Sequence, residues 1–143
     1  MSNLIIEDLK DSILKITLNN PTEQNTLSLQ FINDLKKIFE NADSNDEIKV
    51  IILSSSGKVF SAGHNLKEIK SHRQDKDQGL QFFKDLINSC SDLMLKIIHN
   101  SKPVIAEVNG IATAAGCQLV ASCDLAYASE GSKFATPGVN IGL

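Results

Sequence analysis

The stretch PVIAEVNGIATAAGCQLVASCD, residues 103–124, decides the fold that this chain is expected to adopt. Its pattern indicates an apolar strand, a turn at Asn109 and Gly110, and a helix whose first turn, residues 112–116, consists of small side chains. The first N–H groups of a helix have no partner within it and carry the positive end of its dipole, so a helix start without large side chains can hold a substrate oxygen or a phosphate. The alternative is that small residues only allow close packing on a sheet. The stretch by itself leaves both interpretations open.

The composition is that of one globular domain. The chain has 143 residues, of which 42% are hydrophobic and 22% charged, and its net charge is −3; these values argue against a disordered or fibrous protein. A slight acidic balance and a single arginine, Arg73, provide no basic footprint for nucleic acid. No apolar run approaches the roughly 18 residues that a membrane span needs, and residues 1–10 resemble no secretory or mitochondrial leader. We therefore expect a cytoplasmic protein with neither nucleic acid nor a membrane as partner.

Cysteine and histidine spacing predicts neither disulfides nor a metal site. The three cysteines include no CxxC pair, and their odd number suits a reducing compartment. Cys117 and Cys123, which fall on the helix expected in the quoted stretch, are predicted to be small buried side chains. The three histidines, His64, His72 and His99, lack a ligand spacing such as HxxxH, so no metal is expected.

Strands and helices alternate along the rest of the chain. Apolar runs indicate strands over residues 4–9, 12–18, 49–56 and 125–129. Ser28 is expected to cap one helix. A second helix over residues 80–100 has an expected buried stripe of Phe83, Leu86, Ile87, Cys90, Leu93, Met94, Ile97 and Ile98. Residues 71–79 contain no apolar residue and are predicted to be an exposed loop. Such alternation predicts a parallel, right-handed α/β arrangement.

Two loops rich in glycine and small residues follow two of the predicted strands. FSAGHN, residues 60–65, comes after the strand at 49–56, and NGIATAAG, residues 109–116, comes after the strand that begins at Pro103. Ligands gather at the carboxyl ends of parallel strands, so both loops should lie on one side of the sheet. Two converging backbone N–H groups would form an oxyanion hole, worth roughly 3 to 4 kcal/mol per donor. The glycines match neither GxGxxG, nor a P-loop, nor a GxSxG elbow.

Four motifs in this order and spacing resemble the amino-terminal part of the enoyl-CoA hydratase/isomerase (crotonase) superfamily. They are NNPTEQNTLS (19–28), KVFSAGHNLKEI (58–69), KPVIAEVNGIATAAGCQLVASCDLAYAS (102–129) and FATPGVNIGL (134–143). The GHN loop is also similar to the GHD loop of methylmalonyl-CoA decarboxylases. The resemblance covers essentially the whole chain, although family domains are substantially longer.

The resemblance implies an α/β fold, the repeated ββα spiral of the ClpP/crotonase type. Residues 1–143 would form a single spiral core domain without the carboxyl-terminal helical part that helps to complete the pocket and the trimer. It implies an acyl-CoA thioester as substrate, with coenzyme A entering as part of that substrate, no tightly bound cofactor, and a homotrimer or hexamer for the full-length protein. The oxyanion hole would be made by the backbone N–H groups of His64 and Ala115. The coenzyme A path would be lined by Thr26, Ala62, His64, Asn65 and Leu66, with Lys67 as a weaker candidate for a phosphate contact.

The same alignment shows where the chain departs from the family pattern. The two glutamates that hydratases use to activate water fall at Gln118 and Gly138. A glutamine amide can orient water but cannot act as a carboxylate base, and glycine offers no side chain. His64 either handles a proton beside the thioester or contributes only its N–H. We therefore expect an acyl-CoA enzyme of the hydratase/isomerase class that stabilises a thioester enolate without the usual hydration mechanism. The alternatives are a non-catalytic acyl-CoA-binding or assembly member and a decarboxylase- or thioesterase-like variant.

Overall fold

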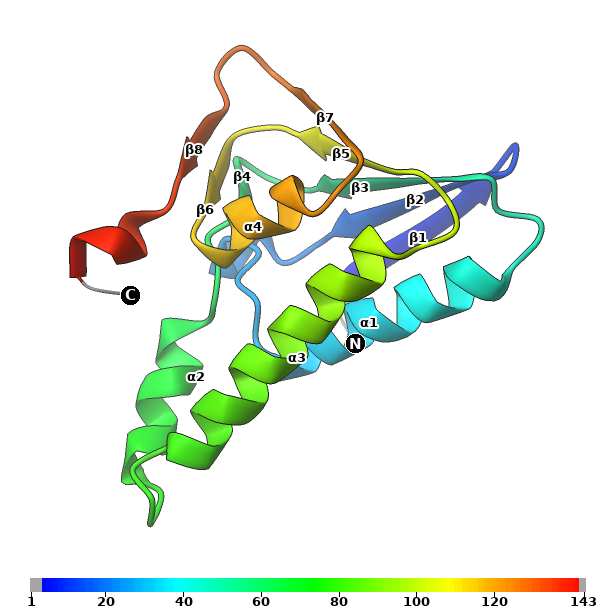
Figure 1. Cartoon of the computed structure of the whole chain (residues 1–143). Coiled ribbons are helices and arrows are strands. Elements are labelled where there is room, and N and C mark those ends of the chain that lie inside the picture. The colour runs from blue at the N-terminus through cyan, green and yellow to red at the C-terminus, as the bar shows by residue number, and fades with distance from the viewer. Residues whose placement is uncertain (1–3, 142–143) are drawn as a thin grey trace.

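The computed structural model describes residues 4–141, which form two sheets with helices packed against them (Figure 1). The five-stranded sheet has the order β1-β2-β3-β5-β7, and the three-stranded sheet has the order β4-β6-β8. The strands of the first are Ile5–Lys10, Ile13–Leu18, Val50–Ser55, Val104–Val108 and Leu125–Ala128; those of the second are Val59–Ser61, Ile111–Thr113 and Lys133–Ala135. All neighbouring strands are parallel except β1 and β2.

After the hairpin β1-β2, which lies wholly in the five-stranded sheet, each turn of the chain adds one strand to each sheet. Strands β3 and β4 are followed by α2 (Leu66–Ser71) and α3 (Leu80–Ile98), strands β5 and β6 by α4 (Ala115–Ala121), and strands β7 and β8 by the 3-10 helix η3 (Pro137–Ile141). This is the ββα repeat that the family resemblance implies. The strands that these connections join are parallel, as predicted. The last two residues of the FATPGVNIGL motif lie outside the described residues.

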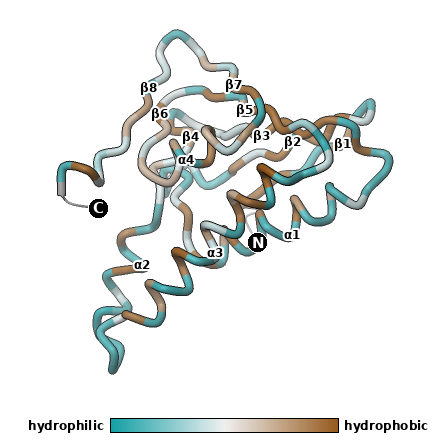
Figure 2. The backbone as a smooth tube through the Cα atoms, in the orientation of Figure 1, coloured by the Kyte–Doolittle hydropathy of each residue, from teal (hydrophilic) through white to brown (hydrophobic). Residues whose placement is uncertain are grey.

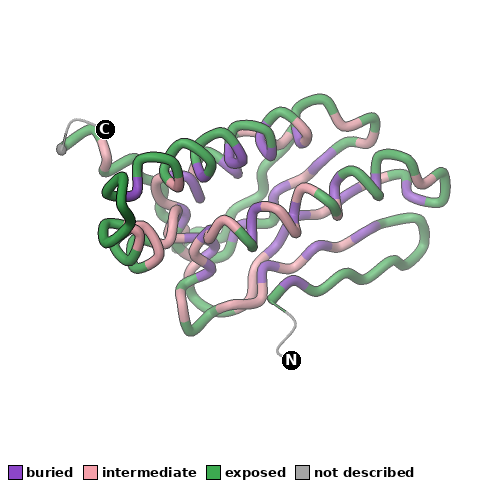
Figure 3. Tube along the Cα trace, turned by 90° about the horizontal axis from the view of Figure 1, so that it is seen from below, coloured by how far each residue is buried: buried purple, intermediate pink, exposed green. Residues whose placement is uncertain are grey.

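Helices α1 (Leu29–Ser44) and α3 pack together across one face of the five-stranded sheet, and this is where the core lies (Figure 3). Helix α1 begins where the sequence predicts, because the Ser28 hydroxyl accepts the N–H of Phe31 at 3.2 Å. Strand register aligns the buried residues Ile16, Leu53 and Ala106 in a row across the sheet beneath the helices. Hydrophobic residues follow these strands, whereas the loop joining α2 to α3 is hydrophilic (Figure 2).

Three short strands were not expected from the sequence, and one of them changes the quoted stretch. Residues 111–113 belong to β6, so the helix begins at Ala115 and not at the small residues before it. Strands of three residues contain too few positions for an alternating pattern to be recognised. Strand β4 overlaps the start of FSAGHN and strand β6 lies inside NGIATAAG, so the residues that follow these strands, 62–65 and 114, extend from the small sheet.

Helix α3 buries a narrower stripe than predicted. Leu86, Cys90, Leu93, Met94 and Ile97 are buried, but the exposed fractions of Phe83, Ile87 and Ile98 are 42%, 40% and 53%. The prediction was wrong for these three residues because α3 packs mainly against α1 and the sheet on one side, and its amino-terminal half extends beyond the sheet beside α2 (Figure 1).

The segment over residues 71–79 is mostly exposed, as predicted, but it is an ordered turn. It contains the short helix η2 (His72–Gln74) and ends at the buried Gly79. The His72 ring stacks on Phe82 with 3.7 Å between ring centroids, and its Nδ1 lies 2.7 Å from Asp75.

The prediction that Cys117 and Cys123 are small buried side chains is also corrected. Both residues are only partly buried. The Cys123 thiol donates to the Leu119 carbonyl oxygen at 3.3 Å. Burial, with a smaller contribution from the charge of Asp124, raises the pKa of Cys123 to about 12, so this thiol stays protonated and unreactive at neutral pH.

Alanine substitutions at Leu86 and Leu95 test which face of α3 is buried. Leu86 is 0% exposed and Leu95 is 49% exposed on the same helix. Leu86→Ala is expected to lower the free energy of unfolding by about 2–5 kcal/mol, because it removes buried methyl groups and leaves a cavity. Leu95→Ala, the matched control, should stay within about 0.5 kcal/mol of the parent. Urea unfolding measures both, and equal losses would contradict the observed packing.

Candidate functional site

The loop after β4 leaves a single backbone N–H group without a partner. In residues 62–65, three of four consecutive N–H groups donate to acceptors of the chain: Ala62 to the Gln24 carbonyl at 3.1 Å, Gly63 to Ser61 Oγ at 3.3 Å and Asn65 to the Leu27 carbonyl at 3.1 Å. The N–H of His64 has no acceptor among residues 4–141. The loop therefore holds one donor ready for a ligand oxygen.

A second unpartnered N–H lies at the start of α4. Ala114 joins β6 to α4 with φ 52° and ψ −126°, an unusual conformation for a residue with a side chain. Its own N–H donates to the Ala135 carbonyl at 2.9 Å, and its carbonyl accepts the N–H groups of Cys117 and Gln118. The N–H of Ala115, the first helical residue, has no acceptor within the described part of the chain. The first N–H groups of a helix normally have no partner within the helix, so the Ala115 N–H is available to a ligand.

The two loops touch each other at these donors. Gly63 has φ +83°, and a Cβ built on it would lie 3.1 Å from the Ala115 nitrogen and 2.9 Å from the Ala114 Cβ. A Cβ on Gly116 would lie 2.3 Å from the Ser61 carbonyl oxygen. Residues 63 and 116 therefore have no room for a side chain. The loops meet at the carboxyl ends of two neighbouring parallel strands, β4 and β6, which is the arrangement predicted from the sequence with a different pair of strands.

A pocket of about 350 Å³ adjoins the loop after β4. It is lined by Thr22, Glu23, Gln24, Thr26, Ala62, His64, Asn65, Leu66 and Lys67. All the residues predicted for the coenzyme A path are among them, whereas Ala115, Gln118 and Gly138 are not. Thr26 Oγ1 and His64 Nε2 are buried and have no hydrogen-bond partner within the described residues. Buried polar atoms without a partner are costly, and a bound group or water would relieve that cost.

The side chains that line the pocket carry almost no net charge. Burial lowers the pKa of the His64 imidazole, so the ring carries no charge at neutral pH. The Lys67 ammonium lies 3.0 Å from the Glu23 carboxylate at the exposed rim. Asn65 caps the short helix α2, because its side-chain oxygen accepts the N–H groups of Lys67 and Glu68. The single predicted cation is therefore already paired with an anion.

Gln118 and Gly138 lie outside this pocket. Gln118 is exposed on α4, one turn beyond Ala115, and Gly138 is partly buried in η3. Neither carries a group that titrates near neutral pH.

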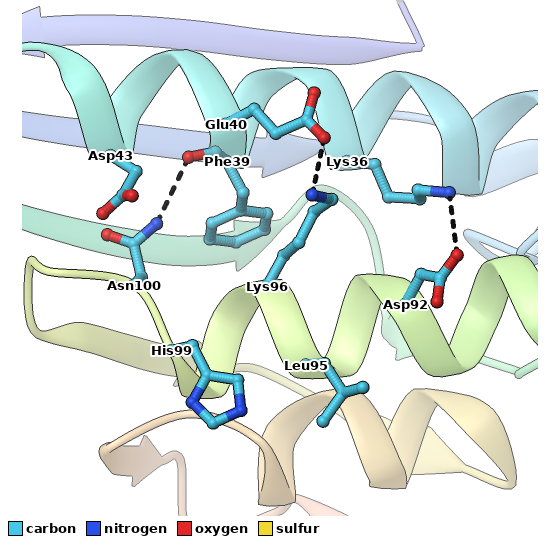
Figure 4. Close-up of a pocket in the computed structure, with 9 residues that line it drawn as sticks. All are labelled: Lys36, Phe39, Glu40, Asp43, Asp92, Leu95, Lys96, His99 and Asn100. Carbon is cyan, nitrogen blue, oxygen red and sulfur yellow. Dashed lines mark hydrogen bonds and ion pairs between the residues drawn. The ribbon is translucent and has the colours of Figure 1, made fainter.

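A larger hollow of about 650 Å³ lies between α1 and α3, and no residue of the two loops lines it (Figure 4). Its charged side chains already pair across the helices, with Lys36 3.5 Å from Asp92 and Lys96 2.6 Å from Glu40. The Asn100 amide donates to the Phe39 carbonyl at 3.2 Å. These interactions join the two helices and leave no converging set of free groups, so the hollow is a surface groove of the helix pair.

The sequence reasoning missed Asn25 and Ser61, which hold the loop after β4. Both are 0% exposed, and the Ser61 hydroxyl donates to the Asn25 carbonyl at 2.8 Å. Asn25 stands in a polar run, NNPTEQN, that reads as an ordinary loop, and Ser61 is one small residue among several. The one sequence signal for these two residues was their position within the family motifs, Asn25 in NNPTEQNTLS and Ser61 in KVFSAGHNLKEI.

No group of three or more His, Cys, Asp or Glu side chains among residues 4–141 is arranged to hold a metal ion. No helix in this part of the chain combines the length and the hydropathy of a membrane-spanning segment.

Comparison with known proteins defines the class. A family model described as enoyl-CoA hydratase/isomerase matches residues 8–143, and the chain belongs to this family. It is similar to the human enoyl-CoA hydratase domain-containing protein 3, with 52% identity over 134 residues that cover 93% of this chain and 42% of that protein. The chain thus spans about half the length of the curated relatives it matches.

Solved structures agree with the fold. The crystal structure of the human enoyl-CoA hydratase domain-containing protein 3 superposes with a TM-score of 0.88 at 45% identity and covers 99% of this chain and 54% of that one. An enoyl-CoA hydratase from Bacillus anthracis gives a TM-score of 0.90 at 26% identity, over 99% of this chain and 53% of that one. The α/β crotonase fold is therefore confirmed, and the matched region is the amino-terminal part of the family domain.

The expected cytoplasmic location is corrected by the same relatives. The human protein and its counterparts from Danio rerio and Xenopus laevis, 51% and 48% identical to this chain, are all named mitochondrial. The composition of residues 1–10 was no guide to the compartment, because targeting signals are separate from the folded domain.

The proton affinity of His64 provides a test that needs no ligand. Burial lowers the pKa of its imidazole from the ordinary value of 6.5. The unfolded chain therefore binds this proton more tightly than the folded chain, so stability is full above the ordinary pKa and is lost as the pH falls toward the lowered one. In an NMR titration, the His64 ring signals should show a midpoint below 6.5.

The matched control is His64→Gln, which identifies the signals and removes the titrating group. Below neutral pH its free energy of unfolding should fall less steeply than that of the parent. A His64 midpoint at or above 6.5 would show that the ring is not desolvated as the structure indicates.

Proposed function

We propose that this chain binds an acyl-CoA thioester and polarises the thioester carbonyl with the backbone N–H groups of His64 and Ala115. The observation that carries the proposal is that these two N–H groups find no acceptor among residues 4–141 and belong to loops that touch each other. Membership of the enoyl-CoA hydratase/isomerase family supports an acyl-CoA as the ligand. Negative charge that develops on the carbonyl oxygen would be stabilised by both donors, each worth roughly 3 to 4 kcal/mol.

Coenzyme A would lie along the pocket beside the loop after β4. Thr26, Ala62, Asn65 and Leu66 line this pocket, and the unpartnered Thr26 hydroxyl is suited to a polar group of the ligand. Lys67 is a weaker phosphate ligand, since its ammonium would have to leave Glu23, 3.0 Å away. Coenzyme A enters as part of the substrate in this proposal, and the full-length protein is proposed to be a homotrimer or hexamer.

The proposed chemistry is stabilisation of a thioester enolate without the usual hydration. Gln118 and Gly138 stand where the family resemblance places the two hydratase glutamates, and neither can exchange a proton near neutral pH. His64, whose backbone N–H is one of the proposed donors, also carries a titratable ring, and the ring stays neutral near pH 7 because burial lowers its pKa.

A non-catalytic acyl-CoA-binding or assembly role is the second candidate. It is favoured by the burial of His64 Nε2, because a nitrogen closed to solvent is poorly placed to exchange protons with it. In this case His64 would contribute only its backbone N–H, and the two donors would serve binding. Decarboxylase- and thioesterase-like reactions are the enzymatic variants, because decarboxylation depends more on enolate stabilisation than on a base.

A pair of ligands that differ only at the carbonyl tests the donors. Calorimetric titration of the full-length protein with acetyl-CoA and with its thioether analogue S-ethyl-CoA, which lacks the oxygen, should show about a tenfold preference for the thioester. Ala115→Pro removes one of the two proposed N–H donors. Residue 115 is the first residue of the helix, where proline is tolerated, so the preference for acetyl-CoA over S-ethyl-CoA should fall. Ala115→Gly keeps the N–H and should keep the preference. Equal affinity of the parent for both ligands would reject the proposed function.

The rate of crotonyl-CoA hydration tests whether Gln118 and Gly138, in place of the two family glutamates, remove the usual hydratase activity. General acid–base groups contribute about 100- to 10,000-fold to a rate, so hydration should be slower by at least about 100-fold than in a family hydratase that carries both glutamates. The rate is measured by loss of the enoyl absorbance. Turnover comparable to that hydratase would show that another group replaces the missing carboxylates.

A further inference from the structure

We propose that Ser61, held by Asn25, is the positioning residue that sets the two N–H donors relative to each other. The inference rests on the function proposed above. It assigns a role to two buried residues that line neither the pocket beside the loop after β4 nor the hollow between α1 and α3.

The Ser61 hydroxyl uses both of its hydrogen-bonding capacities inside the loop. Ser61 is 0% exposed, its Oγ donates to the Asn25 carbonyl at 2.8 Å, and the same oxygen accepts the Gly63 N–H at 3.3 Å. The Gly63 carbonyl accepts the Leu27 N–H at 2.8 Å. Both polar groups of Gly63 are thus held.

This arrangement determines the direction of the donor at His64. The peptide between Gly63 and His64 is planar and trans, so its N–H points opposite to its carbonyl. Because that carbonyl is bound to Leu27, the His64 N–H must point away from Leu27, where the described residues offer no acceptor. A change in the position of Gly63 would therefore turn the donor.

Asn25 holds the acceptor to which Ser61 donates. Its amide is 0% exposed and fully used: Nδ2 donates to the Ser56 carbonyl at 3.0 Å and the Val59 carbonyl at 2.8 Å, and Oδ1 accepts the Asn20 N–H at 2.7 Å. The first two bonds link the end of β3 to the start of β4. A buried amide with every group bonded is rigid and costly to disturb, because removing one partner leaves the others unpaired.

Ser61 also touches the loop that carries the second donor. A Cβ on Gly116 would lie 2.3 Å from the Ser61 carbonyl oxygen and 2.7 Å from the Ser61 Cβ, so the first turn of α4 rests directly on this residue. Ala115, whose N–H is the second donor, immediately precedes Gly116. Ser61 therefore contacts one loop through its hydroxyl and the other through its main chain, and its position sets the spacing of the donors.

The decisive variant is Ser61→Ala, compared with Ser54→Ala as a matched control. Ser54 is 2% exposed and its hydroxyl also makes two contacts, to Thr17 Oγ1 at 3.0 Å and the Ile16 carbonyl at 3.5 Å, but it lies in β3 away from the loops. Each variant removes one buried hydroxyl. A purely structural effect would therefore be similar in both.

The readouts are the preference for acetyl-CoA over S-ethyl-CoA and the infrared frequency of a ¹³C-labelled thioester carbonyl bound to the full-length protein. In Ser61→Ala the preference should fall about tenfold and the binding-induced carbonyl shift should shrink, while S-ethyl-CoA affinity stays within about twofold. Ser54→Ala should retain both. Ser61→Cys, which fills the same space with a weaker hydrogen-bonding group, should show a smaller loss and serves if Ser61→Ala does not fold.

The outcomes separate the two proposals. Absence of a thioester preference in the parent protein would reject the proposed function and this inference with it. A parent preference that survives unchanged in Ser61→Ala, or that falls equally in Ser54→Ala, would overturn the positioning role alone.

Discussion

A Cβ on Gly116 would lie 2.3 Å from the carbonyl oxygen of Ser61, so the first turn of α4 reaches the end of β4 only because residue 116 has no side chain. The arrangement of the site depends on this contact. It holds the loop after β6 against the loop after β4, where Gly63 lies directly against the Ala115 nitrogen. With a larger residue at either glycine, the strands would still pair, but the two unpartnered N–H groups would be pushed apart.

The surrounding hydrogen bonds explain why these two N–H groups are left over. Around His64 the neighbouring backbone donors are used by Gln24, Ser61 and Leu27, and at α4 the helix geometry itself leaves the first N–H free. Donors that are already aimed need no reorganisation when a ligand charge develops, which makes such groups effective. The rigid support comes from residues in the core of the loop, Asn25 above all, and not from residues that line the pocket.

Much of the fold was predictable, because the large elements carry clear periodicity. Strands β1, β2, β3 and β7 fall within two residues of the expected bounds, helix α1 begins at the expected Ser28 cap, and β5 begins one residue after Pro103. The short strands β4, β6 and β8 were missed, since three residues carry no recognisable period. On α3, hydrophobicity alone suggested that Phe83 and Ile87 are buried, whereas burial depends on which neighbours a helix meets, and α3 meets few at its amino-terminal end.

The sequence by itself identified the family through a resemblance carried by four ordered motifs, and alternating strand and helix patterns predicted the parallel α/β class. It also singled out the motifs FSAGHN and NGIATAAG, whose small residues and glycines leave backbone groups accessible. By the same resemblance, Gln118 and Gly138 remain the predicted positions of the two hydratase glutamates. Only the tertiary structure showed that β4 and β6 lie within these motifs, that the His64 ring is partly desolvated, and that Asn25 and Ser61 hold the loop after β4 from within. The physical reason is that each of these facts is a contact between segments far apart in the chain. Ser61 lies 36 positions from Asn25, and local patterns carry no information at that range.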